Sequence, residues 1–214
     1  MSASNRLFEL KDVACRRGGR VLFRNLSFGV GEGEVVHLAG PNGSGKTSLL
    51  RIMAGALPCE GQVLWGNDNF LEKGVDEHAR RFAFLPSDDR NLKVLETVSE
   101  NLSFWAGLWQ VADAAARIAA ALEALGMTAL KDTALRYLSA GQKRRVSLAR
   151  VLVKESKLWL LDEPFNGLDD ASAGLFKAAL DAHLSAGGMA AIASHHAIEP
   201  SQKGSLRRVT LGEA

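Results

Sequence analysis

A glycine-rich segment that ends in lysine and threonine is the part of this 214-residue sequence whose spacing most directly predicts chemistry. It follows an apolar segment and precedes a stretch with helical spacing. Glycines let successive backbone N–H groups turn toward one anion, and the helix start adds the positive end of its dipole. The lysine would reach the outer phosphates, and the threonine hydroxyl would bind Mg²⁺. The expected nucleotide-binding residues are Gly40, Pro41, Asn42, Gly43, Ser44, Gly45, Lys46, Thr47 and Ser48.

Two adjacent carboxylates follow a second apolar segment, residues 158–161. A segment that is apolar on both faces is typical of a central strand, and α/β sheets bind ligands at the carboxyl ends of such strands. We expect Asp162 to hold the Mg²⁺ shell and Glu163 to orient and deprotonate a water, because phosphoryl transfer needs positioning and charge neutralisation more than covalent help. The alternative is that both side chains only cap the following loop.

A third motif, residues 138–142, precedes a segment with helical spacing that extends to residue 153. Ser139 and Gln142 have the spacing of a capping box, in which each side chain bonds the backbone N–H of the other. Such boxes also occur on helices that bind nothing. A capped helix start preceded by Gly141 is nevertheless suited to hold a second anionic group.

The elements that must position these motifs alternate along the chain. Glycines at 18 and 19 separate two strand-like segments, 6–15 and 21–30, which predicts an N-terminal hairpin. Strands are expected at 35–39, 62–65, 81–85, 157–162 and 189–194, and helices at 46–54, 142–153 and 171–185. An alanine-rich helical pattern covers about 97–130. Alternating strands and helices predict a mostly parallel sheet in an α/β fold.

Composition limits the possible partners. The chain is 47% hydrophobic, and 26 basic against 24 acidic residues leave a formal charge of +2. This balance gives no global attraction to nucleic acid or to anionic lipid. No uncharged segment has the roughly 18 apolar residues of a membrane span, and the first residues do not resemble a secretory signal. Cys15 and Cys59 lack the spacing of a metal or redox motif.

The order of the motifs resembles the ATP-binding cassette (ABC) ATPase family over nearly the whole chain. The resemblance implies a P-loop NTPase fold in one domain, with a RecA-like core at about 1–90 and 138–214 and an inserted helical subdomain at about 91–137. It also implies ATP and Mg²⁺ as cofactors. In this family the motif with Ser139, Gly141 and Gln142 faces the γ-phosphate of ATP on the opposite protomer, so a homodimer of ATPase subunits is expected.

Two further site residues are implied by the same resemblance. Asp169, at the end of the segment 166–169, would reach across the dimer interface. His195 follows the expected strand at 189–194 and matches the switch histidine that contacts the γ-phosphate. Its neighbour His196 is the alternative, but the strand length favours His195.

The sequence departs from the family pattern at two positions. A glutamine usually ends the strand that corresponds to 83–86, whereas Ser87 stands here and Asp88 and Asp89 follow. A serine hydroxyl is shorter, so contact with Mg²⁺ would need a water or one of the aspartates. The aromatic residue that normally stacks on adenine is replaced by Arg17, whose planar guanidinium could stack on the base instead or remain in solvent.

The chain needs a partner on which its ATP cycle acts. It has neither coiled coils nor a second cassette, so a separate transmembrane permease is a better prediction than nucleic acid. Docking is expected near Ser87 and the segment 100–109, where Trp105 and Trp109 share a helical face and either pack internally or contact the partner.

A narrower resemblance, to ATPase subunits of cytochrome c maturation, rests on residues 15–23, 40–51, 100–105, 137–153 and 187–189. It implies a peripheral position at the cytoplasmic face of the bacterial inner membrane. It also implies a role in haem export, haem delivery or release of a haem chaperone, with haem handled by partners. The alternatives are the ATPase of an unrelated ABC exporter and a nucleotide-gated scaffold that hydrolyses poorly.

Overall fold

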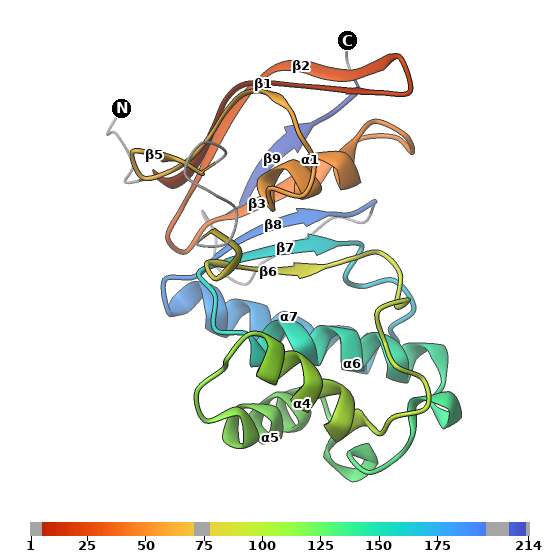
Figure 1. Ribbon diagram of the computed structural model, residues 1–214. Coiled ribbons are helices and arrows are strands. Elements are labelled where there is room, and N and C mark those ends of the chain that lie inside the picture. Colours follow the sequence, from red (N-terminus) through yellow and green to blue (C-terminus); the bar gives the residue numbers. More distant parts are fainter. Residues whose placement is uncertain (1–5, 71–77, 196–205, 213–214) are drawn as a thin grey trace. The chain divides into compact units, whose positions relative to one another are not determined.

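The computed structural model describes residues 6–70, 78–195 and 206–212 (Figure 1). Among these residues, no helix is both long and apolar enough to cross a bilayer. The elements, in chain order, are β1 (Arg6–Arg17), β2 (Arg20–Gly31), β3 (Val35–Ala39), α1 (Lys46–Met53), β4 (Glu60–Trp65), β5 (Asp68–Asn69), β6 (Phe82–Leu85), α4 (Val98–Leu108), α5 (Ala114–Ala124), the 3₁₀ turns Thr128–Leu130 and Leu135–Tyr137, α6 (Ala140–Val153), β7 (Leu158–Asp162), α7 (Asp170–Ser185), β8 (Met189–Ala193) and β9 (Leu206–Thr210).

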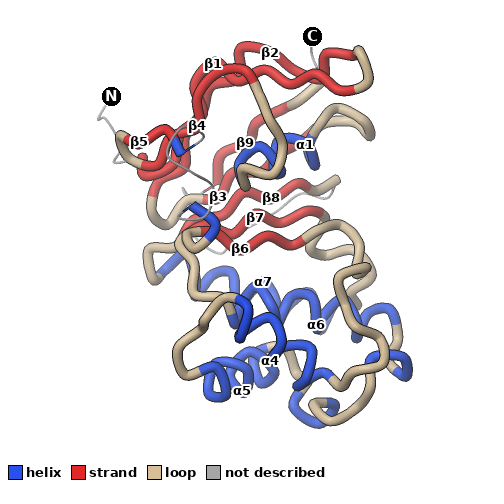
Figure 2. Tube along the Cα trace, in the orientation of Figure 1, coloured by secondary structure: helices blue, strands red, loops and turns tan. Residues whose placement is uncertain are grey.

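The chain divides into two compact units. The first, here called the sheet unit, comprises Met1–Phe84, Ser156–Glu163 and His183–Ala214. The second, here called the helical unit, comprises Leu85–Glu155 and Pro164–Ala182. Between residues 90 and 155 the trace is helix and loop (Figure 2). The expected limits of an inserted helical subdomain, about 91–137, stay a prediction.

The core sheet of the sheet unit has five strands in the order β6-β7-β8-β3-β9. Strand β8 pairs in parallel with β7 and β3, and β3 pairs in parallel with β9. Every residue of β3, β7 and β8 is buried, which explains their apolar sequences without alternation. The mostly parallel sheet is confirmed. Strand β9 was not predicted; it is an edge strand in which no residue is fully buried, so it lacks the apolar run that marks β3, β7 and β8.

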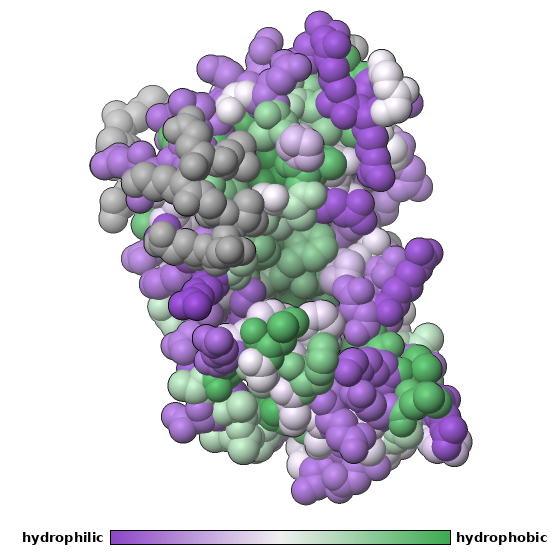
Figure 3. Space-filling view, viewed as in Figure 1, coloured by the Kyte–Doolittle hydropathy of each residue, from purple (hydrophilic) through white to green (hydrophobic). Residues whose placement is uncertain are grey.

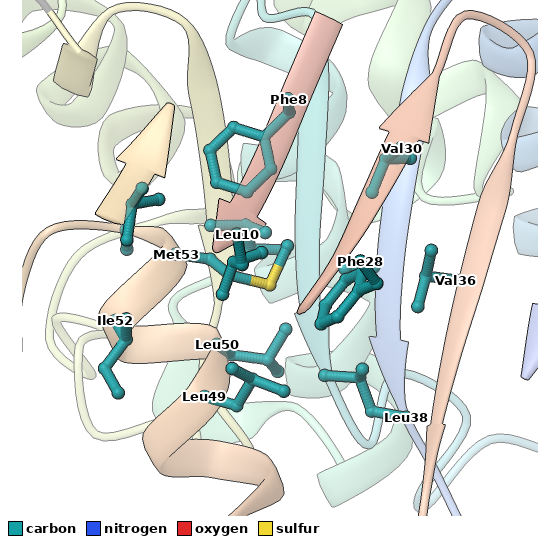
Figure 4. Packing of buried hydrophobic residues seen from close by; sticks show 14 of the residues in the cluster. Phe8, Leu10, Phe28, Val30, Val36, Leu38, Leu49, Leu50, Ile52 and Met53 are labelled. Carbon is teal, nitrogen blue, oxygen red and sulfur yellow. The ribbon is translucent and has the colours of Figure 1, made fainter. Parts of the chain in front are cut away.

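The predicted N-terminal hairpin is also present, in a second, antiparallel sheet with the order β2-β1-β4-β5. Gly18 and Gly19 both have positive φ, 57° and 76°, which a tight hairpin turn requires and which glycine adopts without steric cost. Phe8 and Leu10 of β1 and Phe28 of β2 pack with residues of α1 and β3 in one apolar cluster (Figure 4). This cluster fixes α1 between the two sheets of the unit.

Helix α1 begins directly after the glycine-rich loop and ends where the sequence predicts. Gly55, at φ 69°, donates its N–H to Ile52, and the next residue, Ala56, donates to Arg51. These two bonds satisfy carbonyl groups at the helix end in a Schellman motif, which confirms the glycine cap. The position of α1 is therefore set at one end by the loop and at the other by this cap.

The alanine-rich pattern of residues 97–130 forms two helices with a break between them. Gln110 and Asp113 both have positive φ, 54° and 51°, so the backbone leaves the helical region between α4 and α5. Thr97 and Glu100 form a capping box at the start of α4. Spacing alone did not locate the break, because neither break residue is glycine or proline.

Asn101 on α4 organises the loop that precedes its helix. Its side chain is fully buried, donates to the carbonyl groups of Lys93 and Thr97 at 3.0 and 2.9 Å, and accepts the N–H of Lys93 at 2.8 Å. One buried amide thus bonds three backbone groups of the loop and the helix start, although the carbonyl groups of Lys93 and Thr97 also accept the N–H groups of Glu96 and Asn101.

Replacement of Asn101 by alanine should destabilise the protein by about 2–4 kcal/mol, because a fully buried side chain and its hydrogen bonds to the loop and helix start are lost. Urea denaturation followed by circular dichroism measures the change. Ser103→Ala, at an exposed position of the same helix, is the matched control and should change stability by less than about 0.5 kcal/mol. Equal effects of the two substitutions would contradict this role of Asn101.

Candidate functional site

The glycine-rich loop connects the end of β3 to the start of α1 in the sheet unit. Gly40, Gly43 and Gly45 all have positive φ, at 143°, 80° and 101°. A Cβ on Gly40 would collide with the backbone oxygen of Leu211, and one on Gly45 would lie 3.1 Å from the ring of Phe23. The backbone therefore follows a path open to glycine alone at these positions, as expected for a loop that turns its N–H groups toward an anion.

The polar groups of this loop fit a phosphate. Gly45 precedes α1 and no side chain caps the helix, so its first N–H groups have no side-chain partner. Ser44 Oγ is buried and has no hydrogen-bond partner among the described residues. Lys46 is 8% exposed, and its Nζ donates to the carbonyl groups of Gly40 and Pro41 at 2.8 and 3.1 Å. The loop thus holds a cation and orphaned donors around one point.

Thr47 and Asp162 meet where the start of α1 approaches the end of β7. Thr47 Oγ1 donates to Asp162 Oδ2 at 2.8 Å, and Asp162 is 2% exposed. A hydroxyl and a carboxylate oxygen in contact are hard oxygen ligands of the kind that Mg²⁺ prefers. Thr47 and Asp162, which are 115 positions apart in the chain, therefore fit the expected metal site.

Glu163 has a backbone conformation that the sequence did not predict. Its φ is 48°, and its N–H donates to the carbonyl of Ala193 at 2.8 Å. A non-glycine residue in this region is strained, and such residues occur most often at functional sites. The turn places the carboxylate next to His195: Glu163 Oε1 lies 3.3 Å from His195 Nε2, and Oε2 accepts the His195 N–H at 3.4 Å.

The position of His195 depends on the end of β8. His37 of β3 contacts the carbonyl of Ser194 at 3.0 Å through Nε2 and so holds the residue before His195. The His195 side chain is 43% exposed, whereas the Glu163 side chain is 11% exposed. His196, the alternative, lies outside the described residues.

Arg17 lies at the end of β1 and is exposed. It is paired across the hairpin with Arg20, another exposed arginine. The same hairpin contacts the phosphate loop, because the side chains of Leu22 and Phe23 face Gly45. Arg17 is thus carried by a hairpin that touches the loop, and its expected stacking on a base stays a prediction.

The motif that contains Ser139, Gly141 and Gln142 lies in the helical unit, at the start of α6. Gln142 N–H donates to Ser139 Oγ at 3.2 Å, and Ser139 N–H donates to Gln142 Oε1 at 2.9 Å, so the capping box is present. A Cβ on Gly141 would lie 2.8 Å from the carbonyl oxygen of Gly167. The glycine is therefore required for close contact with the segment that carries Asp169, a role that spacing alone did not show.

Asp169 has a local function in addition to the expected one across an interface. Its Oδ1 accepts the N–H of Ser172 at 2.7 Å at the start of α7. Bonds to the backbone and side chain of Ser172, with a smaller effect of Arg145, hold the pKa of this carboxyl below its usual value. Asp169 is thus exposed and ionised in the neutral range, and the helix start fixes its direction.

Ser87 lies in the helical unit on an exposed loop that follows β6. Of the two aspartates beside it, Asp88 contacts exposed Arg90, whereas Asp89 accepts a hydrogen bond from Ser147 Oγ on α6 at 2.7 Å. Asp89 is therefore hydrogen-bonded to α6 in this structure. Its role was missed in the sequence, where the only signal was the adjacent pair of aspartates.

The aromatic residues of α4 fall into two groups. Trp105 and Trp109 are half-buried; Arg150 lies 4.0 Å from the centroid of the Trp105 ring, and Lys154 lies 5.0 Å from that of Trp109. The two tryptophans thus pack against α6 by cation–π contacts. Four other apolar side chains of α4 and of the loop before it are exposed, and apolar side chains reach the surface of the helical unit in Figure 3. We call them the apolar patch: Val94, Leu95, Phe104 and Leu108, between 44% and 75% exposed.

Comparison with known proteins agrees with this geometry. The family model described as ABC transporter matches residues 23–166. The cytochrome c biogenesis ATP-binding export protein CcmA of Paramagnetospirillum magneticum is 45% identical over 195 residues, which cover 90% of this chain and 89% of that protein. The protein of the same name from Pseudomonas putida is 42% identical over 203 residues and 94% of each chain.

A solved structure shows the same fold. It is described as a putative ABC transporter (ATP-binding protein) from Pyrococcus furiosus, and it superposes with a TM-score of 0.81 over 95% of this chain and 96% of that one, at 24% identity. The chain therefore belongs to the ABC transporter family, as an ATP-binding subunit close to the cytochrome c biogenesis ATP-binding export proteins CcmA.

Proposed function

We propose that this ABC transporter ATPase works as a homodimer in cytochrome c biogenesis, on a permease at the cytoplasmic face of the bacterial inner membrane. The observation that carries the proposal is the joint placement, in one unit, of Lys46 in the glycine loop, Thr47 against Asp162, and Glu163 against His195. The similarity to CcmA proteins over nine-tenths of the chain supports the assignment to cytochrome c biogenesis.

The residues of the sheet unit divide the work of ATP hydrolysis. The loop N–H groups and Lys46 bind the phosphates, while Thr47 and Asp162 hold Mg²⁺, which would supply charge neutralisation on the phosphate oxygens. Glu163 accepts a proton from the attacking water, because it is the second carboxylate at the strand end and its strained backbone directs it into the site. His195, in contact with Glu163, orients the carboxylate and reaches the terminal phosphate.

The second half of the site comes from the partner protomer. Ser139, Gly141 and Gln142 form a capped helix start, which suits the γ-phosphate of an ATP held by the other subunit. Asp169 lies near them, because it follows Gly167 by two residues and the Gly167 carbonyl faces Gly141. Its side chain is exposed. We expect the two protomers to close on each other only when nucleotide is bound.

An ABC ATPase subunit partners with a transmembrane permease, and the apolar patch is the surface that we assign to that contact. Exposed apolar residues that are clustered rather than single mark interaction sites. The described histidines outside the ATP site are engaged in packing, since the ring of His183 stacks on Trp159 at 4.0 Å and that of His78 on Phe70 at 3.6 Å. Haem is accordingly handled by the partners.

One observation favours a second candidate, a nucleotide-gated scaffold with poor hydrolysis. Ser87 replaces the glutamine of the family, and Asp89 is held on α6. Loss of a metal-contacting side chain would slow chemistry without loss of ATP binding. Measurement of phosphate release by the complex with its permease separates the two candidates, because only an ATPase turns over.

Replacement of Glu163 by glutamine removes the proton acceptor but keeps its size. We expect kcat for ATP to fall by about 100-fold or more, which is the usual contribution of a general base, while ATP affinity changes little. Phosphate release and nucleotide binding by the permease complex measure the two quantities. Glu155→Gln, at an exposed position of the helical unit, is the control. Hydrolysis by Glu163→Gln at the native rate would exclude the assigned base.

Gly141→Ala tests the helix start. The added methyl group would lie 2.8 Å from the Gly167 oxygen, so α6 must shift away from the segment that carries Asp169. We expect kcat to fall by about tenfold, roughly 1.4 kcal/mol in activation free energy, with ATP binding to the loop unchanged. Gly174→Ala on α7, where a Cβ meets nothing within 4 Å, is the matched control. An unchanged kcat for Gly141→Ala would rule out this role of the close contact.

Double substitution of Phe104 and Leu108 by glutamine tests the docking surface. Both side chains are exposed on one face of α4, so the fold should persist while a central apolar contact is lost. We expect the permease to bind about 30-fold more weakly, as for a loss of roughly 2 kcal/mol. Pull-down from detergent-solubilised membranes measures this change. Leu175→Gln, an exposed leucine of α7, should bind normally; retention of full binding by the double variant would assign docking elsewhere.

A further inference from the structure

The loop that carries Ser87 is fastened to α6 at two points. Arg144 Nη1 donates to the carbonyl of Pro86 at 2.9 Å, one residue before Ser87. Two residues after Ser87, Asp89 Oδ1 accepts the hydroxyl of Ser147 at 2.7 Å and lies 3.4 Å from Arg144 Nη1. We call Asp89, Arg144 and Ser147 the Asp89 clasp. Ser87 and Asp88 span the gap between its two attachment points.

The Asp89 clasp is partly removed from solvent. The side chain of Arg144 is 4% exposed and that of Asp89 is 29% exposed, and Ser147 is 1% exposed. A buried guanidinium needs an anionic or carbonyl partner, and charge-assisted bonds in a low-dielectric environment are stronger than those in water. The contacts of Asp89 therefore hold the loop on α6.

The neighbouring ion pair, unlike the Asp89 clasp, is exposed to solvent. Asp88 contacts Arg90 at 3.3 Å, with the two side chains 51% and 87% exposed. Exposed pairs of this kind contribute little to stability. The loop thus has one aspartate with a fixed position on α6 and one that points to solvent.

Helix α6 connects the Asp89 clasp to the capped helix start. Arg144 and Ser147 are three residues apart and share a face of this 14-residue helix. Ser147 lies eight residues after Ser139, about 12 Å along the helix axis at 1.5 Å per residue. A hydrogen-bonded helix moves as a rigid body over such a distance, so a displacement of the loop displaces Ser139 and Gly141 as well.

The same face of α6 reaches α4. Arg150, three residues after Ser147, is influenced by the charge of Asp89, and its guanidinium lies 4.0 Å from the ring centroid of Trp105. Trp105 is adjacent in sequence to Phe104 of the apolar patch. Asp89 therefore joins the loop with Ser87 to α6, and α6 in turn contacts α4 through Arg150 and Trp105.

We propose that Asp89 is a positioning residue for ATP hydrolysis, which couples the loop with Ser87 to the helix start with Ser139 and Gly141. This inference rests on the proposed function, in which the helix start of one protomer closes on the γ-phosphate of an ATP held by the other. The coupling no longer needs the glutamine that is absent at position 87. It needs the hydrogen bonds of Asp89 to α6.

Hydrogen exchange on the full chain in its permease complex tests the coupling without a need for turnover. In the native protein, Mg²⁺ with ATP should protect both the loop at 40–47 and the helix start at 139–145. In Asp89→Ala, the loop should stay protected and the helix start should lose most of its protection. Thr97→Ala, which removes the α4 capping box in the same unit but not the clasp, is the control for general destabilisation and should behave as the native protein.

Kinetics of the same complexes separate positioning from simple loss of structure. Asp89→Ala should lower kcat at least tenfold and leave KM for ATP within twofold. Asp89→Asn keeps an oxygen that accepts the Ser147 hydroxyl and should recover kcat to within threefold of native. Because Asp89→Ala already removes the bond to the Ser147 hydroxyl, the combination with Ser147→Ala should be no slower than Asp89→Ala alone.

The possible outcomes distinguish the coupling from the proposed function. Native protein with no ATP protection at 40–47 overturns the proposed function, and the role of Asp89 falls with it. Loop protection together with native-like protection at 139–145 in Asp89→Ala overturns the coupling alone. The coupling is also overturned when Asp89→Ala slows turnover no more than Thr97→Ala does at an equal loss of melting temperature.

Discussion

The hydrogen bond from Thr47 to Asp162 is the contact that joins the two motifs of the candidate ATP site in the sheet unit. It joins the first turn of α1 to the last residue of β7, and it forms because β3 and β7 flank β8 in one parallel sheet, with their carboxyl ends on the same edge. The glycine loop after β3 and the carboxylates after β7 therefore meet at that edge. The buried cluster between α1 and the two sheets keeps α1 in place, so the polar contact rests on apolar packing.

Three features at this edge cost stability or leave a polar group unsatisfied. Glu163 holds a positive φ, the glycine loop follows a path closed to other residues, and Ser44 has a buried hydroxyl without a partner among the described residues. Each feature costs stability in the absence of ligand. Phosphate and metal would satisfy these groups, and the left-handed turn at Glu163 sets its carboxylate against His195.

The helical unit is held together by a different set of contacts. Its α6 is held by polar contacts from the loop after β6 and by cation–π contacts from the tryptophans of α4. Packing of Trp105 and Trp109 against α6 leaves Phe104 and Leu108 as the exposed apolar residues of α4. The same helix thus has an internal face and an exposed apolar face, which we assign to the permease contact. The resemblance to known cassettes did not separate these two faces, because both are aromatic or aliphatic at helical spacing.

Local signals in the sequence determined the glycine loop, the capping box of Ser139, the glycine cap of α1 and the buried strands, since each depends on neighbours within a few residues. They also determined the family, through the order of the motifs. Only the tertiary structure decided that Gly141 needs the close approach of Gly167, that Asp89 is bound to Ser147, that Glu163 is strained toward His195, and that β9 completes the sheet. These features depend on residues far apart in the chain, and no local pattern encodes which distant backbone or side chain will lie opposite.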